Sequence, residues 1–302
     1  MSFLDTFSQM MVLFFAMLCG YAANKAHYLD AVGNRQIGSL ALNVFLPCLI
    51  LGNVTTGDLP PRSDILSFLG VSLLFFGMAG VFLLTVPRFL PGTPQERGVW
   101  RYMLFFANTA YVGYPVVLFL FGQEGLIYAV ILNIPFNLLC YSLGPLLLVG
   151  TRRFDWRSIR SPGLLISTVS LIIALSRFRP PAWFGETLSF VGDVTVPLSL
   201  ILLGSLLAEL PAGRVFADPK SWILSAVRLL VMPAALSVLL RLIGVPPLMT
   251  GVAVMEMGMP AAANGSMMCL EHGGDIDAMS SLIFLSTLLS LVTIPIIASV
   301  LL

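Results

Sequence analysis

Charged residues are scarce in this sequence: only 10% of its 302 residues are Asp, Glu, Lys or Arg, and the formal net charge is +1. Soluble globular domains carry about 25% charged residues, so this composition argues against a soluble protein. A nearly neutral chain also gives no reason to expect a nucleic-acid partner, which would favour a strongly basic surface.

Residues that bind metals or perform nucleophilic catalysis are also few. The chain has two histidines and four cysteines, and their spacing fits neither a metal site nor a disulfide framework. His27 and His272 stand in expected loops without a partner, and the sequence shows no phosphate-binding loop or nucleophile–base pair. We therefore expect no enzyme, no metal and no cofactor.

Hydrophobic residues dominate instead, at 58% of the chain and a mean hydropathy of +0.95. A transmembrane helix needs about 20 mostly apolar residues. Ten stretches approach that length: residues 3–23, 36–52, 65–87, 102–121, 126–149, 162–177, 187–208, 221–243, 247–269 and 278–301. The predicted fold class is an all-α polytopic membrane protein with ten transmembrane helices in a lipid bilayer.

Lysine and arginine predict the orientation of these spans, because cytoplasmic loops carry an excess of both. If the N-terminus lies outside, the inner loops hold eleven basic residues and the outer loops hold four. Both termini are therefore predicted to face outside. The inner set is Lys25, Arg35, Arg88, Arg97, Arg101, Arg152, Arg153, Arg157, Arg160, Arg214 and Lys220, and the outer set is Arg62, Arg177, Arg179 and Arg241.

Arg228 belongs to neither set, because it lies about two turns into the span 221–243. We expect its side chain to extend to the lipid headgroups, with an ion pair as the alternative. Tryptophans near predicted span ends fit an aromatic belt at the two membrane surfaces: they are Trp100, Trp156, Trp183 and Trp222.

Two of the predicted spans, the fourth and the ninth, are interrupted in corresponding places. Residues 107–115 contain the triplet Gly113–Pro115, and residues 256–265 contain the triplet Gly258–Pro260. Proline removes a backbone donor and clashes with the carbonyl four residues earlier. In lipid, the freed backbone groups persist only where protein or a water-filled cavity satisfies them. Paired interruptions of this kind are typical of a transporter binding site.

Proline motifs recur in the same order in both halves of the chain. The pairs are separated by 150, 145 and 160 residues: Pro47 with Pro197, Pro115 with Pro260, and Pro135 with Pro295. This pattern predicts two five-helix repeats, residues 1–150 and 151–302. An odd number of spans per repeat inverts the second one, so the fourth and ninth helices are expected to cross near the bilayer midplane.

With these motifs the chain resembles the auxin efflux carrier family over essentially its whole length. The resemblance implies a fold related to bile-acid sodium symporters and sodium/proton antiporters. In that fold the first, second, sixth and seventh spans form a scaffold, and spans three to five and eight to ten form a transport domain. The best-matched pieces are Leu42–Pro47, Ala107–Pro115, Pro197–Leu207, Met259–Asn264 and Gly273–Asp275.

The resemblance also implies a secondary transporter of a small organic anion, such as malate, malonate or an auxin-like acid. Transport would proceed by rocking of the transport domain against the scaffold, and the scaffold would form a homodimer. Only residues 150–161 separate the two halves, which favours a compact bacterial-type carrier of the cytoplasmic (inner) membrane. A sodium-coupled symporter of the bile-acid type and a non-transporting membrane sensor remain alternatives.

A broken helix offers two kinds of ligand. The half-helix after the break presents N–H groups that suit a carboxylate, so the residues at and after Pro115 and Pro260 are candidates for substrate binding. The preceding half presents carbonyls, here of Tyr111 and Glu256, that suit a cation or water. Interhelical bonding or packing is the alternative for the other candidates, which are Asn108, Tyr111, Tyr114, Asn133, Asn137 and Asn264.

Glu256 and Asp193 are the acidic candidates for ion coupling. A carboxylate in mid-span is costly and usually functional, and burial favours its protonated form, which suits a proton carrier. Sodium coordination by Glu256 and an ion pair with Arg228 are alternatives. Uniport driven by the membrane potential needs neither. The candidate hinges are Pro47, Gly113, Pro197 and Gly258.

Overall fold

The computed structural model describes residues 3–150, 162–209 and 218–300, and nearly all of them are helical. Within these ranges the only β-type pairing is an antiparallel bridge between Ala107 and Ala261. The all-α membrane character is confirmed, whereas the ten-span count and the inverted repeat stay predictions. Six helical stretches there are long and apolar enough to cross a membrane: Ala31–Thr56, Arg62–Phe89, Thr109–Cys140, Ala182–Glu209, Pro219–Leu242 and Ile276–Val300.

Some sequence predictions lie outside the described residues. They concern the segment that connects the two halves, residues 151–161, and five of the eleven basic residues expected inside. Those five are Arg152, Arg153, Arg157, Arg160 and Arg214, and Trp156 lies outside as well.

The chain divides into two compact units. Unit 1 comprises Met1–Leu69, Ala110–Ile134 and Ile159–Glu209, and unit 2 comprises Gly70–Thr109, Pro135–Ser158 and Leu210–Leu302. The boundary between them falls within α4 (Arg62–Phe89) and within α6 (Tyr114–Val149). The assignment of a scaffold and a transport domain stays a prediction.

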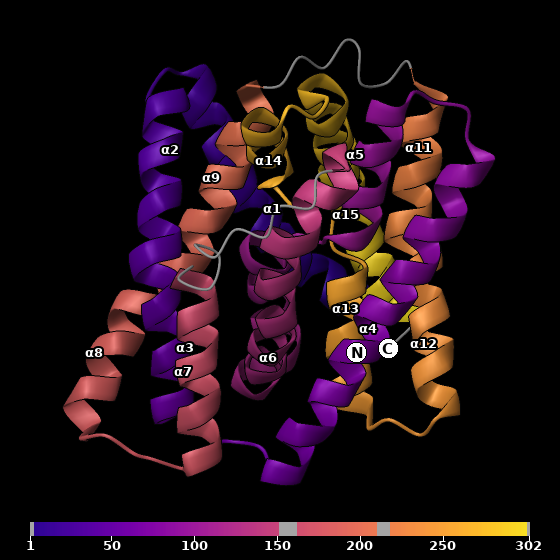
Figure 1. The fold of residues 1–302 in the computed structure, drawn as a ribbon. Helices are drawn as coiled ribbons and strands as arrows, with labels where there is room; N and C mark the ends of the chain where they lie inside the picture. Colours follow the sequence, from indigo (N-terminus) through magenta and orange to yellow (C-terminus); the bar gives the residue numbers. More distant parts are fainter. Residues whose placement is uncertain (1–2, 151–161, 210–217, 301–302) are drawn as a thin grey trace. The chain divides into compact units, whose positions relative to one another are not determined.

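Unit 1 is built from pairs of closely packed helices. α1 (Phe3–Lys25) packs against α9 (Thr195–Glu209), and α3 (Leu46–Thr56) packs against α7 (Pro162–Ser176) and α8 (Ala182–Gly192) (Figure 1). A Cβ atom added to Gly20 would lie 1.9 Å from the carbonyl oxygen of Ile201, and one added to Gly204 would lie 1.8 Å from that of Met17. Glycine is therefore required at both positions, as is common where membrane helices approach closely.

Arginine side chains in the connection between α7 and α8 also tie unit 1 together. Arg177 donates through Nη1 to the carbonyl of Leu59 at 2.9 Å and through Nη2 to the carbonyl of Pro60. Arg179 donates to the carbonyl of Thr55 at 2.8 Å. These bonds satisfy carbonyls at and just beyond the end of α3, which lack helical partners.

Unit 2 is organised around α15 (Ile276–Val300). This helix contacts four others and the π-helix η4 (Val227–Val231). The four are α5 (Pro94–Phe105), α11 (Pro219–Ala226), α13 (Pro247–Met257) and α14 (Gly265–His272), and α12 (Met232–Leu242) packs against α13.

Each of three π-helices ends two residues before a proline. η1 (Ala41–Phe45) precedes Pro47, η2 (Thr109–Gly113) precedes Pro115, and η4 precedes Pro233. The clash between a proline ring and the carbonyl four residues earlier falls inside each π-helix, where the wider turn accommodates it. Two of the predicted hinge positions, Pro47 and Gly113, therefore lie in or next to widened but unbroken helix.

Regular helix is interrupted at two further positions, one at Gly122 and one shortly before the predicted hinge Pro197. Gly122 adopts φ 67°, a left-handed conformation that favours glycine, and it divides α6 between the stretches predicted as the fourth and fifth spans. Pro197 is the third residue of α9, just after the turn at Asp193 and Val194 that separates α8 from α9.

Candidate functional site

The two interrupted segments pair with each other in unit 2. α5 ends at Phe105, and η2 begins at Thr109; α13 ends at Met257, and α14 begins at Gly265. The backbone N–H of Asn108 donates to the carbonyl of Pro260 at 2.8 Å, and that of Ala262 donates to the carbonyl of Phe106 at 3.1 Å. We call residues 106–108 and 258–264 the crossing. Each break thus satisfies backbone groups that the other one frees, as a low-dielectric site requires.

The position of the first break differs from the sequence prediction. Phe106 is extended, with φ −106° and ψ 115°, whereas the triplet Gly113–Pro115 lies at the end of η2 and the start of α6. The half-helix after the break therefore begins at Thr109, six residues before Pro115. In the second segment the break contains Pro260, as expected, and Gly258 forms the end of α13.

Arg228 of η4 holds the C-terminal ends of both half-helices. Its side chain is 0% exposed, Nη1 donates to the carbonyl of Leu104 at 2.9 Å, and Nε donates to the carbonyl of Met259 at 3.2 Å. The prediction that Arg228 extends to the headgroups is wrong. The side chain stays inside because the last carbonyls of a helix lack helical partners, and here they accept the guanidinium bonds that water would otherwise provide.

Glu256, in the last turn of α13, is also 0% exposed. Neither of its carboxylate oxygens forms a hydrogen bond with the described residues, but the carboxylate interacts electrostatically with Arg228. Its backbone carbonyl accepts from the N–H of Met259 at 3.3 Å. The expectation that this carbonyl faces a cation or water stays a prediction.

The side chain of Asn264, at the start of α14, forms polar contacts with Tyr102 and Cys140, which also contact each other. The hydroxyl of Tyr102 donates to Asn264 Oδ1 at 3.1 Å and lies 3.4 Å from Cys140 Sγ, and Asn264 Nδ2 donates to the same sulfur at 3.3 Å. Tyr102 and Cys140 are functional candidates that the sequence did not suggest. They stand 162 and 124 residues away from Asn264, so no local pattern brings them together.

Ser286 of α15 is a further residue that the sequence analysis missed. Its hydroxyl accepts from the N–H of Ala261 at 3.1 Å, so it satisfies a donor inside the second break. Ser286, Ser290 and Thr293 are buried and recur at helical spacing on α15. That polar stripe in an otherwise apolar helix is the signal that could have revealed them.

The other predicted side chains are placed as follows. Asn108 and Tyr114 are buried, whereas Tyr111 and Asn137 are half-buried. Asn133 is buried and donates to the carbonyl of Ala129 in its own helix at 3.1 Å. Asn108, Pro260 and Asn264 come together at the crossing in unit 2, while Tyr111, Tyr114, Pro115 and Asn133 belong to unit 1.

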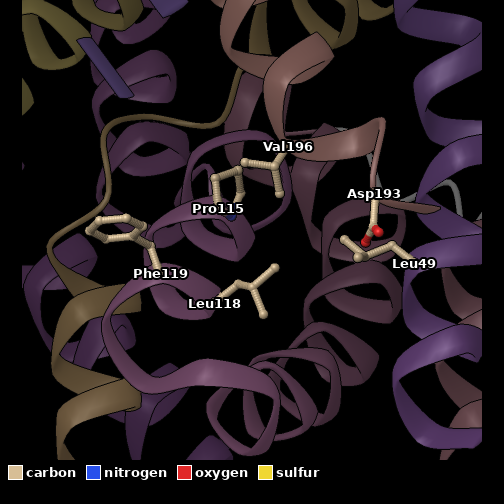
Figure 2. A pocket seen from close by; sticks show the side chains of 6 residues that line it. All are labelled: Leu49, Pro115, Leu118, Phe119, Asp193 and Val196. Carbon is tan, nitrogen blue, oxygen red and sulfur yellow. The ribbon is translucent and has the colours of Figure 1, made fainter. Parts of the chain in front are cut away.

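Unit 1 contains a cavity of about 400 Å³ that brings together Pro115 and Asp193. Asp193 lies in the turn between α8 and α9 and is exposed. Figure 2 shows its carboxylate beside Leu49, with Pro115 beside Val196. The six lining residues are Leu49, Pro115, Leu118, Phe119, Asp193 and Val196, so the lining is apolar except for one carboxylate. No group of His, Cys, Asp and Glu in the described ranges could hold a metal ion.

Comparison with known proteins gives matches over nearly the whole chain. The model of a family described as membrane transport protein matches residues 5–153 and 144–298. An uncharacterized transporter of Methanothermobacter thermautotrophicus is 27% identical over 98% of this chain and 98% of its own length. An uncharacterized transporter of Methanocaldococcus jannaschii is 25% identical over 94% of this chain and 95% of its own.

Proposed function

Because the chain belongs to the membrane transport protein family, we propose that it is a secondary transporter of a small organic anion. The resemblance to the auxin efflux carriers is confirmed, and the family together with six long apolar helices makes the chain an integral membrane protein. The family and both relatives are transporters, and neither indicates a catalytic activity.

The observation that carries the proposal is the crossing. Two interrupted helices pair through their breaks, so four half-helix ends meet at one place inside the chain. The two C-terminal ends, which attract cations, are held by Arg228. The starts of η2 at Thr109 and of α14 at Gly265 offer N–H groups and partial positive charge, which suit a carboxylate.

The side chains that we assign to substrate binding at the crossing are Asn108 and Asn264, next to Pro260. An amide both donates and accepts hydrogen bonds, so it can orient a carboxylate. The contacts of Asn264 with Tyr102 and Cys140 fix its orientation before a substrate binds. Along the chain after the first break, the assignment extends to Tyr111, Tyr114, Pro115, Asn133 and Asn137.

The cavity of unit 1 supports a particular kind of acid. Its volume of about 400 Å³ lies within the range of small-molecule sites, and five of its six lining residues are apolar. A dianion in this cavity would place two negative charges near the carboxylate of Asp193, whereas a monoanion would place only one. We therefore propose a monocarboxylate with an apolar body, of the auxin-like kind, ahead of malate or malonate.

The remaining parts of the proposal follow from the family resemblance. Alternating access would come from rocking of the transport domain against the scaffold, and two copies would pair through the scaffold. The carrier would lie in the cytoplasmic membrane with both termini outside.

Uptake by proteoliposomes tests the proposed function. The purified protein is reconstituted, and the uptake of radiolabelled acids is followed with sodium, proton and potential gradients imposed separately. The panel pairs monocarboxylates that have apolar bodies with dicarboxylates of similar size. We expect faster uptake of the monocarboxylates than in protein-free liposomes, and a strong reduction in Asn108→Ala. Failure of every organic acid to enter would refute the proposal.

A further inference from the structure

The carbonyl ends of half-helices in broken-helix carriers commonly coordinate the transported cation. In this chain those carbonyls have a permanent partner. Leu104 lies at the end of α5 and Met259 lies just after α13, and both carbonyl oxygens accept hydrogen bonds from Arg228, at 2.9 Å and 3.2 Å. The guanidinium of Arg228 therefore lies where a bound metal ion would otherwise be expected.

An acidic side chain, that of Glu256, is buried in the same unit as Arg228. Arg228 and Glu256 are each 0% exposed, and their charges interact. A buried carboxyl group without hydrogen bonds needs either a nearby positive charge or a proton of its own. Both carboxylate oxygens of Glu256 and the Nη2 atom of Arg228, which carries two N–H groups, lack hydrogen-bond partners among the described residues. The guanidinium thus bonds to the carbonyls and offsets the carboxylate at once.

We propose that Arg228 is the resident cation of the crossing and Glu256 its counter-charge, so that transport by this chain needs no sodium ion. The inference rests on the proposed transport function, but the binding part of it is testable without any substrate. Arginine suits the role because its guanidinium keeps its proton under all physiological conditions and presents several donors in a fixed plane. In η4, the widened turn before Pro233, it reaches both half-helices.

The resident-cation proposal makes a prediction about the wild-type protein. Thermal unfolding in detergent, followed by the fluorescence of the four tryptophans, is compared in sodium chloride and in choline chloride of equal concentration. An ion that binds only the folded state raises the Tm. We expect the same Tm in both salts, and uptake rates within about twofold of each other; a Tm several degrees higher in sodium would overturn the proposal.

Removing the guanidinium should create a sodium site. In Arg228→Ala, the carbonyls of Leu104 and Met259 and the carboxylate of Glu256 remain, and such oxygen ligands suit a hard cation. We expect a Tm that rises by several degrees in sodium relative to choline. In the double variant Arg228→Ala with Glu256→Ala this sodium response should disappear, because the negative charge is gone.

Arg177→Ala is the matched control. Arg177 also donates to two backbone carbonyls beyond a helix end, but it does so in unit 1. The control should lower the Tm equally in both salts. A merely structural Arg228 predicts the same behaviour for Arg228→Ala, so a sodium response that is absent in both variants overturns the proposal.

Two further outcomes are informative. If Arg228→Ala can be purified in sodium but not in choline, the proposal is supported. If it can be purified in neither salt, the wild-type comparison decides alone. A wild-type protein that is insensitive to sodium but carries no organic acid would refute the proposed function and leave the resident cation standing.

Discussion

The crossing and the cavity each contain one acidic side chain, but the two carboxylates have different surroundings. Glu256 is 0% exposed and lies near the charge of Arg228. Asp193 is exposed and lines a cavity whose other lining residues are apolar. A fully buried charge depends on its neighbours, whereas an exposed one can respond to solvent and to a ligand. We therefore propose that Glu256 has an architectural role at the crossing, whereas Asp193, predicted as a candidate for ion coupling, is placed where it can affect a ligand in the cavity.

The largest effect is expected from Arg228→Ala, which removes the positive side of the buried pair. Breaking such a pair destabilises a protein by about 3–5 kcal/mol because it leaves an uncompensated buried charge. We expect a loss of this size in the free energy of unfolding, measured in sodium-free buffer. Arg177→Ala should lose less, since it breaks bonds to carbonyls without leaving a charge unbalanced. Equal losses of unfolding free energy in the two variants would contradict the claim that the arginine at the crossing compensates a buried charge and that Arg177 does not.

A pair of variants at Glu256 measures how strongly the two charges depend on each other. Glu256→Gln leaves Arg228 without its counter-charge, whereas the double variant Arg228→Met with Glu256→Gln leaves no charge at all. Residues whose charges interact couple by about 0.5–3 kcal/mol. The double variant should therefore be more stable than the sum of the losses in Arg228→Met and Glu256→Gln predicts. Strict additivity, measured by chemical unfolding, would show that the charges do not compensate each other.

Glu256→Gln also separates the counter-charge role from a proton-carrying role. A proton carrier at this position predicts that the variant loses the dependence of uptake on external pH. We expect a lower rate with an unchanged pH profile, because the proposal gives Glu256 a structural role beside Arg228 and not the transfer of a proton. A flattened profile in the proteoliposome assay would return Glu256 to the role of proton carrier.

A smaller effect is expected at the polar contacts that hold Asn264. Tyr102→Phe removes the hydroxyl that donates to Asn264 Oδ1 at 3.1 Å. Since a neutral hydrogen bond contributes about 0.5–1.5 kcal/mol, we expect a modest loss of stability. If Asn264 binds substrate, the KM for the acid should rise while the maximal rate changes less. A variant with unaltered KM would remove Asn264 from the site.

The smallest effect is expected in the cavity of unit 1. Asp193→Asn removes a negative charge near a bound anion, and near a water-exposed surface this amounts to roughly 1 kcal/mol or less. The KM for a monocarboxylate should therefore fall by about two- to fivefold, with little change in stability. Glu186→Gln on the exposed surface of α8 is the control. An identical response in both variants would exclude the cavity from substrate binding.

The sequence predicted which helices are interrupted more accurately than it predicted which residues surround the interruptions. The triplets Gly113–Pro115 and Gly258–Pro260 correctly indicated two broken segments, because a helix cannot continue regularly through proline. The first break nevertheless lies upstream, at Phe106 to Asn108, because η2 absorbs the strain of Pro115 in a widened turn. A proline indicates that a helix is disturbed but does not determine which turn opens.

Tertiary partners account for most of what the sequence did not reveal. Arg228 was expected to reach the headgroups because its distance from the span end allows it, yet the carbonyls that it bonds are 124 and 31 residues away along the chain. The contacts of Asn264 with Tyr102 and Cys140 are equally remote. Helical periodicity describes the face on which a residue lies, but it carries no information about which helix end approaches that face.

The most direct test of the account is a counterflow measurement in sodium-free buffer. Proteoliposomes loaded with an unlabelled monocarboxylate are diluted into choline buffer that contains a trace of the labelled acid. Because exchange needs no driving gradient, transport is detected without an imposed ion gradient, and a requirement for bound sodium appears as a loss of accumulation in choline buffer. We predict transient accumulation of label at the same rate as in sodium buffer. Accumulation only when sodium is present, or no accumulation with any acid of the panel, would contradict the account.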